Sequence, residues 1–455
     1  MTEVIKNSQT QFIKMTETPI PKLVTSLAIP TIISMLVSSI YNMADTFFVA
    51  KLGTSAAGAV GIVFSLMAVI QAVGFGLGMG SGSNISRLLG QQKNRDADTI
   101  ASTGFFSAIT FGLILTIFGV VFINALMRNL GATETILPYA KDYARFILFG
   151  APIMCSSFVM NNILRSEGKA ALAMVGITFG GVLNMVLDPI FIFGFNMGIS
   201  GAAIATLLSQ CISFLILLSW FMRGKSTTKL HIKNVSKKIG TYFLIIKTGL
   251  PSLCRQALAS SATIALNVNA AVYGDSAVAA MSIIGRIFVF TMSAMIGLGQ
   301  GFQPVVGYNY GAKKYDRVKE AMFFTFKVGT VIMTALALFG FFFAEDIMKV
   351  FRKEDLAVIA IGALAIKVQC LALPTHPLIV VSNMTLQTVG KSWQGTFLSA
   401  ARQGIFFLPL IIVLPQAFGL LGIQITQPIA DFLNAICSIP FMIIFFKEIS
   451  TNKNQ

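Results

Sequence analysis

The stretch GLGMGSGSNISRLLGQQK, Gly76–Lys93, returns 221 residues later as GLGQGFQPVVGYNYGAKK, Gly297–Lys314. The same offset aligns Pro30 with Pro251 and continues without a gap over 64 positions, of which 15 are identical. A shared pattern of glycine, proline and lysine over that length indicates an internal duplication. The sequence therefore predicts two copies of one structural unit.

The composition is typical of a membrane protein. Of the 455 residues, 55% are hydrophobic and 11% are charged, and the mean hydropathy is +0.78; a soluble domain has about 25% charged residues. A bilayer core of roughly 30 Å is crossed by about 20 apolar residues of helix. Twelve segments meet this description, near 23–50, 57–85, 99–126, 136–162, 170–194, 201–222, 241–273, 276–304, 320–344, 357–388, 392–414 and 419–446. We predict an all-α integral membrane protein with twelve transmembrane helices in two pseudo-symmetric six-helix bundles.

The basic residues predict the orientation. With the N terminus inside, loops and tails on that side hold 21 Lys and Arg and those on the other side hold five. This asymmetry predicts a multi-pass cell-membrane protein with both termini in the cytoplasm, and it accounts for the net charge of +16 without nucleic-acid binding. The predicted parts are a tail (1–22), an N-lobe (23–222), a basic linker (223–240), a C-lobe (241–446) and a second tail (447–455). The first tail lacks the apolar core of a signal peptide, so we expect no cleavage.

Each copy has six helices, so both copies enter the membrane from the same side. Two such bundles facing one another suit alternating access, which makes a transporter the leading class. "GKS" occurs at residues 224 and 390 without the glycine that a phosphate-binding loop needs five residues earlier. We therefore expect no nucleotide-driven pump, no cofactor other than a coupling ion, and a monomer whose partners are small amphipathic or cationic substrates and the lipid bilayer.

Three acids lie well inside apolar segments: Asp45, Asp188 and Asp431. A carboxylate at membrane depth is costly and normally faces a cavity or a partner. Asp45 and Asp188 each precede the outer end of a predicted helix by about five residues, or roughly 7 Å. Thr206 reaches the same level from the next helix, and Asn184 precedes Asp188 by one turn. These groups are predicted to meet at one depth in the N-lobe.

Two carboxylates in a dry pocket repel each other and are poorly solvated, which favours the uptake of a proton. Their oxygens, with those of Asn184 and Thr206, also suit a sodium ion. Pro189 supplies no amide proton, which would leave a backbone carbonyl free. The alternative is structural: Asp188 would cap the broken backbone at Pro189, and Asp45 would bond to Asn184.

The remaining polar groups of the membrane segments are candidates for a substrate cavity or for packing. Asp431 and Arg402 are predicted to form a buried ion pair, with a substrate anchor as the alternative. His376 is the group there that titrates near neutrality. Gln303-Pro304 is expected to end its helix. The candidate cavity residues are Met35, Asn42, Gln71, Arg255, Gln256, Arg286, Met295 and His376.

The order of the motifs resembles one known family. IPTIISMLVSSIYNMADTFFVAKLG (29–53), the two glycine-rich stretches quoted above and LNMVLDPIFIFGFNMGISGAAIAT (183–206) resemble the multidrug and toxic compound extrusion (MATE) family, and most of all its bacterial MepA-type branch, from about Pro21 to Phe446. The resemblance implies a V of two lobes that exports amphipathic, often cationic, compounds against protons or sodium ions. It also implies cation coupling at Asp45, Asn184, Asp188 and Thr206. Some members carry acids on the seventh and tenth helices, but residues 248–273 and 357–388 contain none, which puts sodium coupling through the C-lobe in doubt.

Two rival functions would use other residues of the sequence. A flippase or exporter of a lipid-linked or other endogenous metabolite would need an arginine-rich cavity, for which Arg255, Arg286 and Arg402 are candidates. An intramembrane enzyme would need a paired His and Asp or a metal cluster, and His376 has no acidic neighbour in its own helix. We therefore expect a transporter without enzymatic activity.

Overall fold

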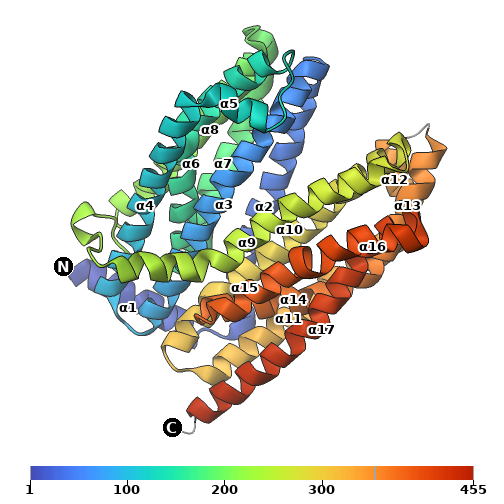
Figure 1. The fold of residues 1–455 in the computed structure, drawn as a ribbon. Coiled ribbons are helices and arrows are strands. Elements are labelled where there is room, and N and C mark those ends of the chain that lie inside the picture. Colours follow the sequence, from blue (N-terminus) through green and yellow to red (C-terminus); the bar gives the residue numbers. More distant parts are fainter. Residues whose placement is uncertain (1, 353–354, 454–455) are drawn as a thin grey trace.

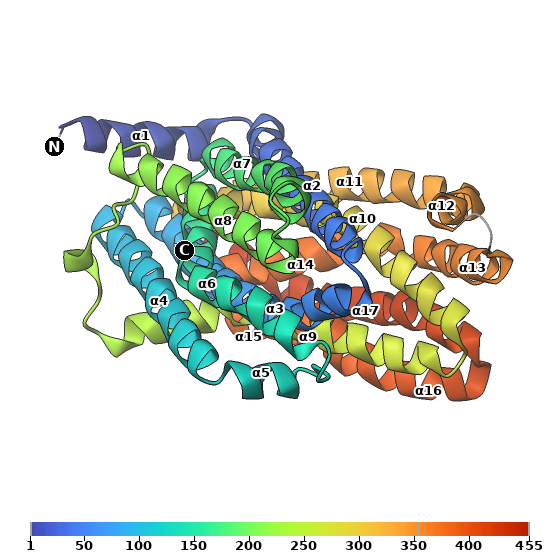
Figure 2. The same cartoon turned by 90° about the horizontal axis from the view of Figure 1, so that it is seen from above.

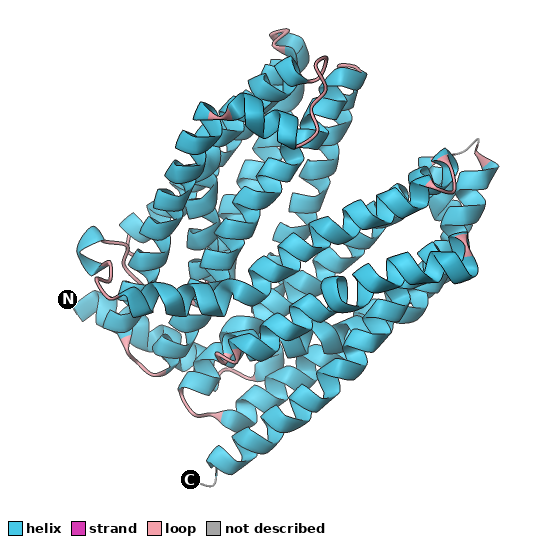
Figure 3. Cartoon of the chain, in the orientation of Figure 1, coloured by secondary structure: helices cyan, strands magenta, loops and turns pink. Residues whose placement is uncertain are grey.

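The protein is a V of two helical bundles that meet at one end. The structure is a computed structural model that describes residues 2–352 and 355–453. Both chain termini lie near the closed end of the V, and the bundles diverge toward the opposite end (Figure 1). Helices connected by short loops make up almost the whole chain (Figure 3), and no strand occurs among the described residues.

The helices divide between the two lobes as the duplication predicts. The N-lobe contains α2 (Ile20–Ala50), α3 (Thr54–Gly90), α4 (Asn94–Val121), α5 (Ile123–Asn129), α6 (Leu137–Ser166), α7 (Ala170–Pro189), the π-helical turn η1 (Ile190–Gly194) and α8 (Gly198–Met222). The C-lobe contains α9 (Ile239–Ala271), α10 (Asp275–Gly311), α11 (Tyr315–Phe342), α12 (Ala344–Phe351), α13 (Leu356–Ala372), the 3-10 turn η3 (Leu373–Thr375), α14 (His376–Thr388), α15 (Ser392–Ala400), the π-helical segment η4 (Ala401–Phe407), α16 (Leu408–Phe418) and α17 (Leu420–Lys453). A further helix, α1 (Thr2–Glu17), precedes them, and a 3-10 turn, η2 (Ile232–Asn234), lies in the linker.

The helices confirm an integral membrane fold. In the described part of the chain, eleven helical spans are long and apolar enough to cross a membrane. The twelfth predicted span, 241–273, is occupied by α9, which is 33 residues long and includes Lys247 and Arg255. Leu356–Thr388 and Ser392–Phe418 each count as one span, although η3 interrupts the first and η4 the second.

One predicted helix end is wrong. Gln303-Pro304 was expected to terminate its helix, but α10 continues through Pro304 to Gly311. A proline inside a helix removes the hydrogen bond to the carbonyl four residues earlier, here that of Gln300. Buried membrane helices tolerate this loss when neighbouring groups satisfy the freed carbonyl, and Gln303, Pro304 and Gln300 are all buried.

The duplicated glycines lie where the two lobes touch. A Cβ added to Gly80 on α3 would stand 2.1 Å from the Ile245 carbonyl oxygen on α9. A Cβ added to Gly301, the equivalent residue on α10, would stand 2.4 Å from the Cα of Ala28 on α2. Glycine thus allows two equivalent helix crossings, α3 with α9 and α10 with α2, in which backbones meet directly. The repeated sequence pattern encodes the interface between the lobes.

The N-terminal helix also joins the lobes. It runs along one edge of the closed end (Figure 2). The Gln11 amide donates to the Glu167 carbonyl of the N-lobe at 2.7 Å, and Asn309 of the C-lobe donates to the Met15 carbonyl at 3.0 Å. Most of the predicted tail 1–22 is therefore helical and ordered against both bundles, which the sequence analysis did not anticipate.

Candidate functional site

The predicted acidic site is carried by three N-lobe helices. Asp45 lies in the last two turns of α2, Asn184 and Asp188 lie in the last two turns of α7, and Thr206 lies in α8. Pro189 directly follows Asp188, and the chain changes there from α-helix to the π-helical turn η1. Because proline cannot donate to the preceding turn, the regular ladder stops at this point. π-helical turns inside helices are frequent at functional sites.

The hydrogen bonds leave several oxygens of this site without a partner. The Asn184 amide nitrogen donates to Asp188 Oδ1 at 3.1 Å and to Thr206 Oγ1 at 3.3 Å. Asp45 Oδ1, Asp188 Oδ2 and Asn184 Oδ1 are buried and have no hydrogen-bond partner among the residues that the structure describes. Buried oxygens without donors are costly, so this group of atoms is suited to receive a proton or a small cation.

The two carboxylates interact electrostatically although no direct bond joins them. Asp188 is fully buried and experiences the charge of Asp45. Asp188 makes a side-chain bond to Asn184 rather than a cap on the backbone around Pro189, and the Asn184 amide nitrogen bonds to Asp188 and Thr206 rather than to Asp45. Among the described residues, the two contacts of the structural alternative are thus replaced by bonds among Asn184, Asp188 and Thr206.

Two tyrosines complete the site and were missed by the sequence analysis. Tyr41 interacts electrostatically with Asp45, and Tyr143 of α6 interacts with both carboxylates. Tyr143 is fully buried, and its hydroxyl also interacts with the Thr206 side chain. Tyr41 precedes Asp45 by four residues on the same helix face, a signal available in the sequence. Tyr143 lies almost a hundred residues from Asp45 in the chain, and nothing in its local pattern marks it.

A cavity of about 180 Å³, lined by both polar and apolar side chains, adjoins this site. It is lined mainly by N-lobe residues, among them the predicted Met35, Asn42 and Gln71, and also by Tyr41. Because Tyr41 lines the cavity and also interacts with Asp45, it connects the cavity to the acidic site. The cavity reaches the C-lobe through Ser293, whose hydroxyl lies 2.7 Å from the Ser39 hydroxyl.

A second cavity of about 370 Å³ lies in the C-lobe. The predicted Arg255 and Gln256 line it, together with Arg402 and several glutamines and methionines. Arg255 takes part in none of the ion pairs found among the described residues. This cavity therefore has a basic and amide-rich wall, in contrast to the acidic site of the N-lobe.

The predicted Asp431–Arg402 ion pair is confirmed, and it has a third member. Arg402 Nε lies 2.7 Å from Asp431 Oδ1, and His376 Nε2 lies 3.2 Å from Asp431 Oδ2. Gln427 also donates to Asp431, at 2.9 Å. His376 thus has an acidic partner from α17, which the inspection of its own helix could not show. Both His376 and Asp431 are fully buried, so this His–Asp pair is closed to a substrate.

Three candidate cavity residues lie elsewhere. His376 is sealed in the cluster just described. Met295 is 1% exposed and its thioether packs against Gly329 of α11. Arg286 is exposed and lines neither cavity. Helical periodicity alone does not distinguish the cavity face of α10 from its packed face, because both faces are largely apolar.

The comparisons with known proteins agree with the two-lobe fold. The MatE family model matches residues 30–190 and 251–413, one match in each lobe. The chain belongs to the MatE family. It is 27% identical over 434 residues to the multidrug export protein MepA of Staphylococcus haemolyticus, covering 94% of each chain.

Solved structures of family members share the fold. An outward-facing multidrug resistance MATE family transporter of the MOP superfamily is 28% identical, with a TM-score of 0.91 over 97% of this chain and 99% of that one. A MOP superfamily transporter from Pyrococcus furiosus, described as having a binding pocket of reverse polarity that suggests a different function, is 28% identical with a TM-score of 0.90 over 96% and 98%. The relatives belong to a family of transporters rather than of enzymes.

Proposed function

We propose that the protein exports amphipathic or cationic drug-like compounds from the cytoplasm in exchange for protons or sodium ions, by alternating access. The observation that carries the proposal is the set of buried oxygens on Asp45, Asn184 and Asp188 that have no partner among the described residues, beside a cavity of mixed polar and apolar lining. Membership of the MatE family and relatives named as multidrug export proteins support both the outward direction of transport and drug-like compounds as the cargo. Both termini lie near the closed end of the V (Figure 1). The excess of Lys and Arg on that side supports an orientation in which the closed end faces the cytoplasm.

The coupling step would act through α2. Asp45 and Tyr41 are on this helix, which also carries Met35 and Asn42 of the cavity wall and crosses α10 of the other lobe at Ala28. A cation that binds Asp45 and Asp188 removes the repulsion between the carboxylates and allows α2 and α7 to approach. Binding shifts the protein between states only by the difference in affinity for those states. We infer that the two acids are closer together in the state that releases cargo outward.

The oxygen atoms of the site could bind either a proton or a sodium ion. A proton needs only one carboxylate oxygen, and Asp188 Oδ2 is unpartnered. A sodium ion would use carboxylate oxygens together with Asn184 Oδ1, because hard cations prefer oxygen ligands. The proton is favoured, since the site offers two carboxylates and one free amide oxygen but no further unpartnered acceptor of the predicted set. Within the described residues, no group of three or more His, Cys, Asp or Glu could hold a metal ion.

The test is transport of a cationic dye into liposomes that contain the purified protein, driven separately by a proton gradient and by a sodium gradient. Asp45→Asn and Asp188→Asn keep the side-chain volume and remove the charge. We expect both variants to bind dye but to lose the increase in transport rate that the gradient causes in the parent protein. A coupling free energy of about 1–3 kcal/mol corresponds to an increase of roughly 5- to 150-fold.

Asp346→Asn is the matched control. This exposed acid pairs with Lys349 at 3.5 Å on the surface, so its loss should leave both gradients effective. Gradient-driven transport that is unchanged in both Asp45→Asn and Asp188→Asn would contradict the proposal. A response to sodium but not to protons in the parent protein would assign the coupling ion to sodium.

A second function, export of an anionic endogenous metabolite, is favoured by one observation. Arg255 presents a charge without an ion-pair partner to the C-lobe cavity, whereas Arg402 is neutralised by Asp431 and Arg286 lies outside. A structural relative is described as having reversed pocket polarity. Arg255→Gln should abolish transport of an anionic compound under this hypothesis and should leave dye export nearly unchanged under the first.

A further inference from the structure

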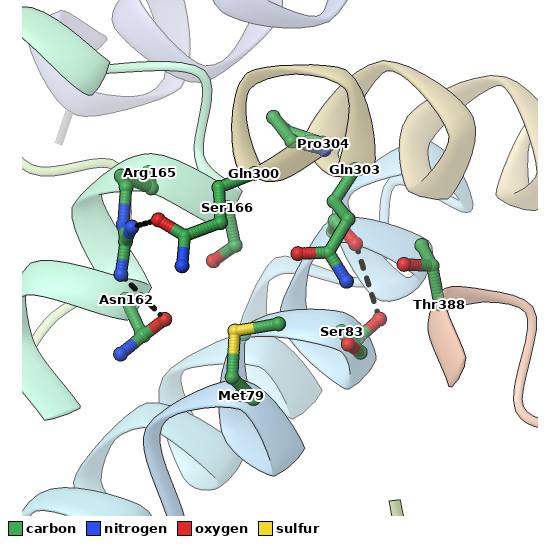
Figure 4. Close-up of a pocket in the computed structure, with 11 residues that line it drawn as sticks. Met79, Ser83, Asn162, Arg165, Ser166, Gln300, Gln303, Pro304 and Thr388 are labelled. Carbon is green, nitrogen blue, oxygen red and sulfur yellow. Dashed lines mark hydrogen bonds between the residues drawn. The ribbon is translucent and has the colours of Figure 1, made fainter. Parts of the chain in front are cut away.

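A small polar chamber lies between the lobes, away from both cavities described above. It has a volume of about 20 Å³ and is lined by residues of α3 and α6 from the N-lobe and of α10 and α14 from the C-lobe. Figure 4 shows Arg165 and Asn162 on one side of the chamber and Gln303 and Thr388 on the other. A space of this size holds about one water molecule or one small ion, so it excludes an organic cargo.

Arg165 brings an uncompensated positive charge to this chamber. Its side chain is buried, with 5% of the residue exposed. It donates to Asn162 Oδ1 at 2.8 Å and to the Gln300 side-chain oxygen across the interface, while its Nε has no partner. No carboxylate among residues 2–352 and 355–453 forms an ion pair with it, and Glu167 binds the linker instead. Burying a charge without a counter-charge is strongly unfavourable.

The opposite wall adds more unpartnered donors. Gln303 Nε2 and Thr388 Oγ1 are buried, and neither has a hydrogen-bond partner in the described part of the chain. In Figure 4 the Gln303 amide and the Thr388 hydroxyl lie across the gap from Arg165. A water molecule accepts two hydrogen bonds and carries no charge, so it would leave the guanidinium uncompensated. A halide ion accepts from several donors at once and supplies the missing charge.

We propose that this chamber binds one small monovalent anion of the size of chloride, held by Arg165, Gln303 and Thr388. The ion would be a ligand distinct from both the coupling cation and the cargo. Because Arg165 belongs to the N-lobe and the other two residues belong to the C-lobe, the bound anion joins the lobes near the closed end of the V. It therefore stabilises the conformation in which this end is closed.

The test compares chloride with gluconate, a larger anion, at equal ionic strength with the full-length protein in lipid nanodiscs. Thermal unfolding should show a saturable rise of Tm with chloride, reproduced by bromide and absent with gluconate. Crystals grown in bromide should show an anomalous scattering peak between Arg165 and Gln303. An unfolding temperature that is the same in chloride and gluconate, or a bromide crystal without that peak, would overturn the proposal.

Two variants locate the effect. Gln303→Glu places a carboxylate in the chamber, so the protein should be stable without chloride and its Tm should no longer respond to it. Arg165→Gln should also lose the response. Arg317→Gln is the control, because this cytoplasmic-end arginine is satisfied by Asn309 and the Thr18 carbonyl; it should retain the full chloride response. A full response in both Gln303→Glu and Arg165→Gln would show that the anion acts elsewhere and would refute the assignment.

Discussion

Glu167 shows how one side chain fixes the linker between the lobes. Its carboxylate accepts bonds from the backbone nitrogens of Thr227 and Thr228 at 2.7 and 2.8 Å, and from the hydroxyl groups of Thr228 and Ser226. Lys169 lies 3.9 Å away, and burial lowers the pKa of that ammonium while Glu167 opposes the shift. Glu167 itself is fully buried. The start of the linker is thus attached to the loop between α6 and α7.

Replacing this carboxylate should release the linker. In Glu167→Gln, one of the two side-chain oxygens becomes an amide donor facing the donors of residues 226–228, and charge-assisted bonds worth about 1.5–3 kcal/mol each are weakened. We expect a lower Tm and faster tryptic cleavage at Lys225 and Lys229, measured on the purified protein. Glu134→Gln is the control, because its exposed pair with Arg128 should contribute less than about 1 kcal/mol. Equal cleavage rates in the two variants would contradict this role.

Single residues differ in how far the sequence predicts them. Asp45 and Asp188 were predicted because a carboxylate in an apolar segment is unfavourable unless it has a function. Glu167 and Arg165 lie near a polar loop, where charged residues are ordinary, so their burial was not visible in the sequence. Their partners are also distant in the chain: Thr228 follows Glu167 by 61 residues, and Gln300 follows Arg165 by 135.

Among the elements, α10, like α3, is a helix whose face toward the other lobe is set by glycine. Gly297 and Gly301 lie against the backbone of α2. A Cβ added to Gly297 would stand 2.6 Å from the Cα of Ile32, and a Cβ added to Gly301 would stand 2.4 Å from the Cα of Ala28. Backbone atoms yield less readily than side-chain ends. A side chain at Gly301 must therefore displace the backbone of α10 or of α2, which belong to different lobes.

Gly301→Ala should therefore separate the lobes near their closed end. We expect a lower Tm and a longer distance between spin labels placed at the closed end on either lobe, measured by electron paramagnetic resonance. Gly285→Ala in the same helix is the control: an added Cβ there meets nothing within 4 Å, and alanine favours a helix interior by roughly 0.5–1 kcal/mol. Unchanged label distances in Gly301→Ala would contradict a glycine-defined interface.

The sequence predicts the positions of the helices well where a long apolar segment defines them. It predicts helix ends poorly where a proline is the signal. Two prolines illustrate the difference. Pro374 lies in the 3-10 turn that divides α13 from α14, within a segment predicted as one helix, whereas Pro304 lies inside α10 and ends nothing. The helix before a proline breaks or continues according to what satisfies the freed carbonyl, and that depends on neighbours that the sequence does not place.

In the whole molecule, the two lobes have similar folds but opposite polar centres. The polar centre of the N-lobe contains Asp45 and Asp188, whose oxygens are partly unpartnered among the described residues. The polar centre of the C-lobe contains Asp431, which is surrounded by Arg402, His376 and Gln427. The duplication predicts the similarity of the folds. It does not predict this division, because the membrane-embedded acids Asp45, Asp188 and Asp431 have no charged counterpart at the offset of 221 residues. We infer that the C-lobe centre is structural and that the N-lobe centre exchanges an ion.

Asp431→Asn tests this division at the scale of the whole protein. Removing one partner of a buried ion pair leaves the remaining charges uncompensated, at a cost of about 3–5 kcal/mol. We therefore expect a marked fall in Tm, while the transport that survives in liposomes still responds to the coupling gradient. Asp188→Asn should show the reverse, a stable protein without the gradient response, because it removes a charge that has no ion-pair partner. If Asp431→Asn retained its stability and lost the gradient response, the C-lobe centre would share in coupling and the two lobes would not divide these roles.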